Sequence, residues 1–311
     1  MAARLAARVK GLSEAEFRAA FGTEEQCRAA LEKLRWPHGF TCPACGHGGH
    51  AWLAGRGLHQ CNRCKRQVSL TAGTIFHATK LPLTTWFLAI HLVATAKNGI
   101  SSIELGRRLG VKQSNAWAMK QKIMQVMLAR EAAKPLQGRV ELDDAYLGGE
   151  RSGGKRGRGA AGKTPFVAAV ETTPERRPRK LKLLPVKGFR KKEVKRLVAK
   201  HLASTSRLVT DGLHCWTAAA EAGLEHTAIV TGSGKRAAQW SPFKWVNTTL
   251  GNVKAAITGT YRYVSPEHAG RYLASFAWRF NRRFQLTSLI PRLVHSAVRT
   301  APLPYHQLVT S

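Results

Sequence analysis

Acidic residues are scarce in this sequence. Its 311 residues include 18 Asp and Glu against 50 Lys and Arg, which leaves a formal net charge of +32. So large a positive excess favours a polyanionic partner, most often a nucleic acid. Ribosome-associated proteins and binders of membrane surfaces share this charge balance. Because 44% of the residues are hydrophobic, the basic composition does not indicate a disordered tail.

Long apolar runs are also missing. No segment approaches the roughly 18 consecutive apolar residues that indicate a transmembrane helix. The N-terminal stretch MAARLAARVKGLSEAEF is basic but lacks the apolar centre of a signal peptide. We therefore expect no membrane partner and a cytoplasmic, nucleoid-associated protein.

Cysteine is infrequent, but four of the six cysteines form a pattern. Cys42 and Cys45 make one CxxC pair, and Cys61 and Cys64 make a second pair after fifteen intervening residues. Each CxxC turn can direct two thiolates at one tetrahedral Zn²⁺, so the spacing predicts a zinc ribbon over residues 37–76. Four thiolates complete the coordination shell, which predicts a structural zinc ion. The three histidines between the pairs are expected in solvent or behind the ligands.

Helical patterns flank the ribbon. An N-terminal region, residues 1–36, contains a helical stretch at 13–35 that starts with a capping box. A second helical region, residues 80–135, ends in two helices separated by a turn at Gly110. This pattern predicts a helix-turn-helix whose second helix contacts DNA through Lys112, Gln113, Asn115 and Lys120. An ordinary helical hairpin with a basic face would give the same pattern.

From residue 138 the periodicity becomes that of strands. Five short β-like runs are interrupted by helical stretches in the order β-β-β-α-β-α-β-α. This order predicts a mixed α/β domain over residues 138–285, antiparallel at its start and parallel later. The Gly-rich basic stretch at 148–163 is either a solvated linker or a loop that contacts phosphate. Residues 286–311 are expected to form a loosely ordered tail.

Two of the predicted strand ends carry aspartates. Asp143 and Asp144 end the first strand, and Asp211 ends the fourth. Sheets of this class place their chemistry at strand ends, so Asp143 and Asp211 are expected to meet there. Close carboxylates repel unless a cation such as Mg²⁺ bridges them, and two bound metals support in-line attack on a phosphodiester. Successive side chains of a strand point to opposite faces of the sheet. If Leu142 points into the core, Asp143 points to the catalytic side and Asp144 does not, so Asp143 is favoured over Asp144. Each aspartate alone also fits a turn or a helix cap.

The helix expected at residues 241–257, SPFKWVNTTLGNVKAAI, contains two asparagines and no acid. Asn247 and Lys254 are seven residues apart, so they lie on one face of the helix. Asn252 points away from that face, toward solvent or DNA. Asn247 is either a ligand that reaches the two aspartates or an ordinary polar residue beside the apolar stripe formed by Val246, Leu250, Val253 and Ile257.

The motifs of this sequence, and their order along the chain, resemble those of insertion-sequence transposases of the zinc-ribbon, ISXO-type group. The resemblance runs from about residue 20 to 287 and rests on CPACG, CNRCKRQVSLTAGTIFHATKLPL, ELDDAYLGG, VTDG, WVNTTLGNVK, GTYRYVS and RYLASFAWRFNRRF. It implies a multidomain α/β protein with N-terminal helices and a zinc ribbon, a helix-turn-helix, and an RNase H-like catalytic domain. The implied reaction is cleavage of DNA at element ends and strand transfer into target DNA, with Mg²⁺ or Mn²⁺.

The resemblance also implies residue roles. Asp143 and Asp211 match the first two catalytic acids of the family. The third position is Glu in many members and Asn in a subgroup, and here it matches Asn247, with Lys254 seven residues later. Asp143, Asp211 and Asn247 would hold Mg²⁺, and Lys254 would contact a phosphate. Because an amide oxygen is a weaker Mg²⁺ ligand than a carboxylate, activity is implied by the Asn subgroup and not by the chemistry alone.

Partners follow from the same resemblance. The terminal inverted repeats and the target DNA are the expected ligands, with further contacts from Arg282 and Arg283. Two DNA ends have to be paired, so a homodimer or a larger assembly is expected. Two other functions fit the motifs: a non-catalytic DNA-binding regulator derived from a transposase, and a stand-alone nuclease. The retained Asp143 and Asp211 argue against the regulator.

Overall fold

The computed structural model describes residues 10–148, 163–230, 241–261 and 263–309. The chain divides into two compact units. The first unit contains Met1–Ala96, Ser102–Val126 and Arg282–Thr310, and the second contains Lys97–Ser101 and Met127–Asn281. The interior of the predicted Gly-rich loop lies outside the described residues. In the part of the chain that is described, no helix combines the length and the apolar character that a membrane span requires.

The first unit is mainly helical. Its elements are α2 (Glu14–Phe21), α3 (Glu24–Arg35), α4 (Leu83–Thr95), α5 (Ser102–Leu109), the start of α6 (Gln113–Ala132), η4 (Leu286–Ser288), α12 (Leu289–Ala297) and α13 (Tyr305–Val309). Capping boxes begin α2 and α3, the first at Ser13 as predicted. Glu24 accepts backbone hydrogen bonds from Leu83 at 3.0 Å and Thr84 at 3.2 Å, so its carboxylate caps α4 from a neighbouring helix.

The C-terminal segment is part of the core of the first unit. Helix α12 packs against α3 and α4, and Arg299 donates a 3.0 Å hydrogen bond to the carbonyl of Leu34. The prediction of a loosely ordered tail at 286–311 is therefore wrong across α12 and α13. Apolar residues recur at helical spacing there and are buried on one face: Leu289, Ile290, Leu293, Val294 and Ala297.

The zinc-ribbon segment forms a small antiparallel sheet in the order β1-β2-β3. Its strands are β1 (His50–Leu53), β2 (Leu58–Cys61) and β3 (Gln67–Ser69), and η1 (Ala54–Arg56) joins the first two. The buried hydrophobic cluster beneath them consists of Phe40, Cys42, Cys61 and Val68, with Trp36 and Cys45 partly buried against it. So small a core cannot hold the chain folded without the metal. Arg35 ties the ribbon to α3 by donating to the carbonyls of Leu70 and Ala72.

The second unit contains a five-stranded mixed sheet in the order β6-β5-β4-β7-β8. Its strands are β4 (Arg139–Leu147), β5 (Thr164–Thr172), β6 (Pro178–Pro185), β7 (Arg207–Thr210) and β8 (Glu225–Ala228). The strands β4, β5 and β6 pair antiparallel, whereas β7 pairs parallel with both β4 and β8. This arrangement confirms the mixed sheet that the order of the motifs predicts.

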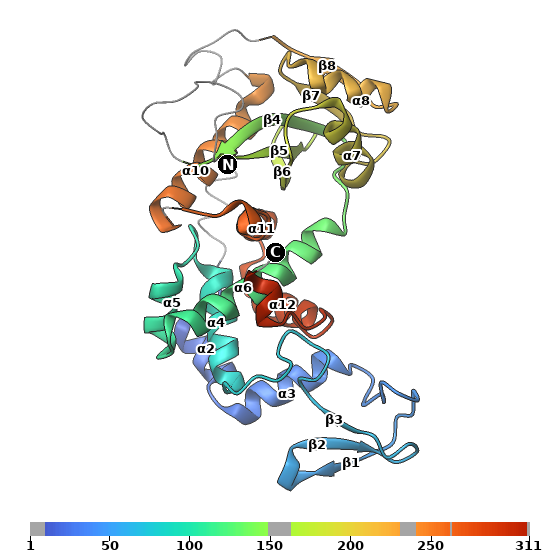
Figure 1. Ribbon diagram of the computed structural model, residues 1–311, viewed down its shortest axis with the longest axis vertical. Helices are drawn as coiled ribbons and strands as arrows, with labels where there is room; N and C mark the ends of the chain where they lie inside the picture. The colour runs from blue at the N-terminus through green and yellow to red at the C-terminus, as the bar shows by residue number, and fades with distance from the viewer. Residues whose placement is uncertain (1–9, 149–162, 231–240, 262, 310–311) are drawn as a thin grey trace. The chain divides into compact units, whose positions relative to one another are not determined.

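Helices cover both faces of this sheet (Figure 1). They are α7 (Lys191–His201), η2 (His214–Trp216), α8 (Thr217–Glu221), η3 (Ser241–Phe243), α10 (Lys244–Tyr261) and α11 (Pro266–Asn281). On β4, Val140 and Leu142 pack toward α7 and α8, whereas Ala145 and Leu147 pack toward α10 and α11. The period of two along β4 thus determines which side chains face α10.

Candidate functional site

The strand register brings two aspartates to one edge of the sheet. β4 and β7 run parallel, and their last paired residues are Glu141 and Val209. Asp143 and Asp211 each follow two residues later, so they reach the same level of the sheet. Their carboxylate oxygens lie within 4.8 Å of each other and of Asp144. The structure therefore brings together the two aspartates that the sequence pairs, and adds a third.

Asp143 lies on the face of β4 that alternation predicts. Leu142 is buried on the side of α7 and α8, and Ala145 is buried on the side of α10. Asp143 shares the side of Ala145. Alternation favours Asp143 over Asp144, but β4 has lost its pairing with β7 at this point, and the Asp144 carboxylate also reaches the cluster.

The three carboxylates perturb one another. Burial raises the pKa of Asp143 to about 7, and the negative charges of Asp144 and Asp211 act in the same direction. The backbone N–H of Asp144, which donates to Asp143 at 2.8 Å, and the positive charge of Lys254 oppose this shift. A cluster of oxygen ligands that resists full ionisation fits a divalent cation such as Mg²⁺ or Mn²⁺.

Trp216 orients Asp211. Its indole N–H donates a 2.9 Å hydrogen bond to Oδ1 of Asp211, and the backbone N–H of Leu213 donates to the same oxygen at 3.2 Å. Trp216 is fully buried among the side chains on the α7 and α8 face of the sheet. Trp216 is not among the site residues that the sequence predicts. A tryptophan five positions after a strand-end aspartate was the available signal.

Glu141 links β4 to the start of α10. Its Oε2 accepts hydrogen bonds from the backbone N–H groups of Trp245 and Val246, both at 3.0 Å. Arg139 donates to Oε1 of Glu141 at 2.7 Å and to the carbonyl of Pro242 at 2.9 Å. A buried carboxylate thus caps α10 and compensates its positive N-terminal dipole. This contact fixes the first turn of α10 on the strand that carries the aspartates.

Helix α10 has the predicted amphipathic pattern. The four apolar positions of its predicted stripe are buried, Asn247 is half-buried and Asn252 is exposed. Lys254 is exposed, and its charge acts on Asp143. A groove of about 460 Å³ runs beside Asp144, with Lys254 and Lys163 in its lining. The two lysines place positive charge beside the carboxylates, which is the charge that a phosphate requires.

The four ribbon cysteines fit a tetrahedral zinc ion. Their sulfur atoms lie within 4.8 Å of one another, and Cys42–Cys64 and Cys45–Cys61 are both 3.6 Å apart. Zinc–sulfur bonds of 2.3 Å in a tetrahedron require about 3.8 Å between sulfur atoms. The backbone N–H groups of Cys64 and Arg63 lower the pKa of the Cys61 thiol, which favours the thiolate that zinc binds.

One histidine of the ribbon is buried. His59 is buried among aromatic rings, 5.0 Å from Trp36, 5.4 Å from Phe40 and 4.9 Å from Trp52 between ring centroids. Its Nε2 lies 3.8 Å from the carboxylate of Glu32. Of the two expected places for this histidine, solvent is wrong, because α3 and the segment that follows it cover β2.

The predicted DNA-contacting side chains of the helix-turn-helix divide into two groups. Lys112, Gln113 and Asn115 are exposed near the start of α6. Lys120 is only 2% exposed, so its prediction as a DNA contact is wrong. Position 120 falls on the inner face of α6, whose neighbours Met119 and Ile123 are also buried.

Arg282 and Arg283 lie half-buried just after α11. Burial lowers the pKa of Arg283 to about 10, and its guanidinium stacks over the ring of Phe284 at 4.5 Å. An arginine in this setting keeps its charge at neutral pH.

Comparison with known proteins agrees with both halves of the described structure. Residues 135–281 match the family described as ISXO2-like transposase domain, and residues 22–67 match the transposase zinc-ribbon domain. The first match contains the aspartate cluster and α10. The chain is also 26% identical over 215 residues to an uncharacterized protein in transposable element ISH50 of Halobacterium salinarum. The alignment covers 63% of this chain and 70% of that protein.

Proposed function

Because the chain belongs to the ISXO2-like transposases that carry a zinc ribbon, we propose that it cuts DNA at the ends of its own insertion sequence and joins those ends to target DNA. The observation that carries the proposal is the cluster of Asp143, Asp144 and Asp211 at one edge of the sheet. Binding to DNA follows from the family, and the pairing of two ends by a homo-oligomer is part of the proposal.

The proposed active site assigns tasks to five side chains. Asp143 and Asp211 hold the divalent metal, and Asn247 completes its ligands from α10. A bound Mg²⁺ or Mn²⁺ supplies Lewis-acid stabilisation of the phosphate and an activated attacking oxygen. Trp216 keeps Asp211 in the orientation that faces Asp143. Lys254 contacts a phosphate of the strand in the adjoining groove.

DNA recognition is proposed for the other parts of the chain. The zinc ribbon at residues 37–76 and the helix-turn-helix within residues 80–135 bind the terminal inverted repeats, and residues 138–285 carry out the reaction. The exposed residues at the start of α6 support this division, because a recognition helix presents its N-terminal residues to the major groove.

Removal of either aspartate tests the proposal. Purified protein with Mg²⁺ or Mn²⁺ is expected to cut a plasmid at the element ends and to produce joined products. Asp143→Ala and Asp211→Ala are expected to abolish both products while binding of the ends persists. Glu225→Gln is the matched control, since Glu225 is an exposed acid of the same sheet. Wild-type protein that binds ends but never cuts them would support a regulator, and cutting without joining would support a nuclease.

Asn247 is tested separately on α10. Asn247→Ala is expected to lower the cleavage rate at least about tenfold, whereas Asn247→Glu retains cleavage because a carboxylate binds Mg²⁺ more strongly. Asn252→Ala, on the exposed face of the same helix, is the control and leaves the rate unchanged. An alanine variant with undiminished cleavage would remove Asn247 from the site.

A further inference from the structure

The two CxxC turns of the ribbon have the same backbone hydrogen bonds. We define the first knuckle as residues 42–47 and the second knuckle as residues 61–66. The N–H after the second cysteine donates to the carbonyl of the first cysteine, from Gly46 at 2.9 Å and from Lys65 at 3.0 Å. In both knuckles the N–H of the first cysteine donates at 3.0 Å to the carbonyl of the knuckle's last residue. The two turns can therefore be compared position by position.

The fifth position of each knuckle has a left-handed backbone. Gly46 has φ of +71° and Lys65 has φ of +59°. Glycine adopts this conformation freely, whereas a residue with a Cβ is strained in it. A Cβ built on Gly46 would meet no atom within 4 Å, so space does not decide between the two residues. A lysine at a position where glycine would relieve strain makes Lys65 a candidate for a side chain with a function.

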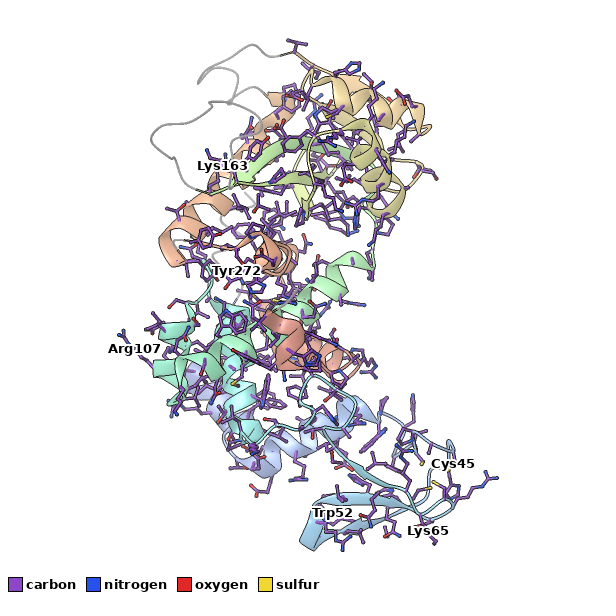
Figure 2. All side chains as sticks on the ribbon, in the orientation of Figure 1. Cys45, Trp52, Lys65, Arg107, Lys163 and Tyr272 are labelled. Atoms are coloured by element: carbon purple, nitrogen blue, oxygen red, sulfur yellow. The ribbon has the colours of Figure 1, made fainter. Side chains whose placement is uncertain are left out.

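The two knuckles also differ in charge. The second knuckle carries Arg63, Lys65 and Arg66, all exposed, and the first knuckle carries no lysine or arginine. Within the described ranges, none of these three cations has a carboxylate within 4.0 Å. In Figure 2, Lys65 lies at the same end of the ribbon's sheet as Cys45. Backbone hydrogen bonds between Cys61 and Lys65 and between Cys61 and Arg66 hold these cations on one turn, and zinc bound to Cys61 and Cys64 would fix that turn further.

The exposed surface of the second knuckle suits a phosphate backbone better than a protein. From Asn62 to Gln67 every residue is exposed, and the side chains are polar apart from the zinc ligand Cys64. Such a surface offers little apolar area to bury against a protein partner. Three cations within four positions match the charge and hydrogen-bonding needs of successive phosphates.

We propose that the second knuckle is a docking site for DNA backbone phosphates, with Lys65 at its centre, and that the first knuckle makes no such contact. The proposal rests on the proposed function, since DNA is the substrate there. The ribbon thereby contacts the duplex with one defined end. Phosphate contacts of this kind position a protein on the duplex and leave sequence readout to other elements.

The test uses the zinc-loaded full chain and a 40-base-pair duplex, with affinity measured across salt concentrations. Each lost phosphate contact is expected to reduce the slope of log affinity against log salt by about 0.9. Lys65→Gly is therefore expected to reduce the slope by about one and Arg63→Gln/Lys65→Gly/Arg66→Gln by about three. Because glycine relieves the left-handed strain, Lys65→Gly keeps its zinc and unfolds at the same temperature as wild type or higher. A misfolded ribbon would instead lose zinc.

Two further variants separate position from net charge. Lys33→Gln removes an exposed lysine from α3 and is expected to leave the slope unchanged. Gly46→Lys/Lys65→Gly moves the lysine to the first knuckle at constant net charge and is expected to bind as weakly as Lys65→Gly alone. Recovery of wild-type binding by this double variant would overturn the proposal. An unchanged affinity and salt slope in Arg63→Gln/Lys65→Gly/Arg66→Gln would also overturn this proposal, but it would leave the proposed function standing. Wild-type protein that binds no DNA would overturn both.

Discussion

At the scale of single residues, the aspartate cluster combines burial with crowded negative charge. Asp143 has a pKa raised to about 7 from an ordinary value of 3.8. An acid whose pKa is raised on folding stabilises the folded state fully below its unfolded pKa. That contribution is lost as pH rises through the folded pKa. The metal-free protein is therefore expected to lose stability between about pH 4 and pH 7 through Asp143.

Asp143→Asn tests this pH dependence. The variant carries no titrating group at this position, so its melting temperature without metal is expected to exceed that of wild type more at pH 8 than at pH 5. At pH 8 the gain in the free energy of unfolding is expected to be at least about 1 kcal/mol. Saturating Mg²⁺ is expected to remove the advantage, because the cation stabilises the ionised wild-type cluster. An equal gain at both pH values would contradict the assignment.

Trp216 allows a test of how Asp211 is oriented. Trp216→Phe keeps a buried ring but removes the N–H that donates to Asp211. The variant is expected to cleave about tenfold more slowly and to require more Mg²⁺ for half-maximal activity, with a loss of about 1 to 3 kcal/mol in stability. Trp278→Phe, at another buried tryptophan of the second unit, is the control. If both variants show the same Mg²⁺ requirement, Trp216 only fills space.

The residues of the site that the sequence predicts are those with short-range signals. Asp143 and Asp211 end recognisable strands, and the 3.6-residue period separates Asn247 from Asn252. Glu141 carries no such signal, because it caps a helix whose N–H group lies 104 positions later in the chain. Trp216 follows Asp211 by only five positions, but the hydrogen bond between them depends on how the chain folds. They became visible only when the backbone partners of α10 and Asp211 were identified.

At the scale of elements, two helices begin on carboxylates from elsewhere in the chain. Glu24 of α3 caps α4, and Glu141 of β4 caps α10. In each case the acid binds two backbone N–H groups that a helix start leaves unsatisfied. These contacts set where the helix meets its neighbour. For α10, that neighbour is the strand with the aspartates.

Glu141→Gln is expected to weaken this junction. The amide keeps the size of the side chain but loses the charge that faces two N–H groups and Arg139. Stability is expected to fall by about 1 to 3 kcal/mol, and cleavage is expected to fall while DNA binding is retained. Glu225→Gln is the control, because it removes an exposed acid that pairs with Arg207 at 2.9 Å. Its loss of stability is expected to be less than about 1 kcal/mol. Equal losses in the two variants would argue against a capping role for Glu141.

The sequence predicts the order of the elements in the sheet domain, but it does not predict helix α12. The change from helical to strand periodicity at residue 138 predicts the sheet and its mixed pairing. Helix α12 is short and contains Pro291, and a proline within a helical pattern is a general signal for a helix end. Pro291 lies in the first turn, where the missing N–H costs no helical hydrogen bond. The burial of α12 also depends on partners more than 190 positions earlier in the chain, which periodicity does not reveal.

At the scale of the whole molecule, the two units should respond differently to loss of zinc. Chelation, or Cys61→Ser, is expected to release one Zn²⁺ and to abolish amide protection across β1 to β3, because the ribbon core is too small to fold alone. The strands β4 to β8 have their own core and should stay protected in hydrogen exchange. Cys215→Ala is the control and should retain its zinc. Uniform loss of protection in both units would show that they unfold together.

The participation of α12 in the first unit has a consequence for the order of events during synthesis. The five-stranded sheet and its helices come almost entirely from the continuous stretch Met127–Asn281, so they can fold once that stretch has left the ribosome. The helices of the first unit are made earlier, yet α3 and α4 cannot be covered until α12 emerges. The helical unit that is made first can therefore be completed only after the stretch that forms the sheet has been synthesised.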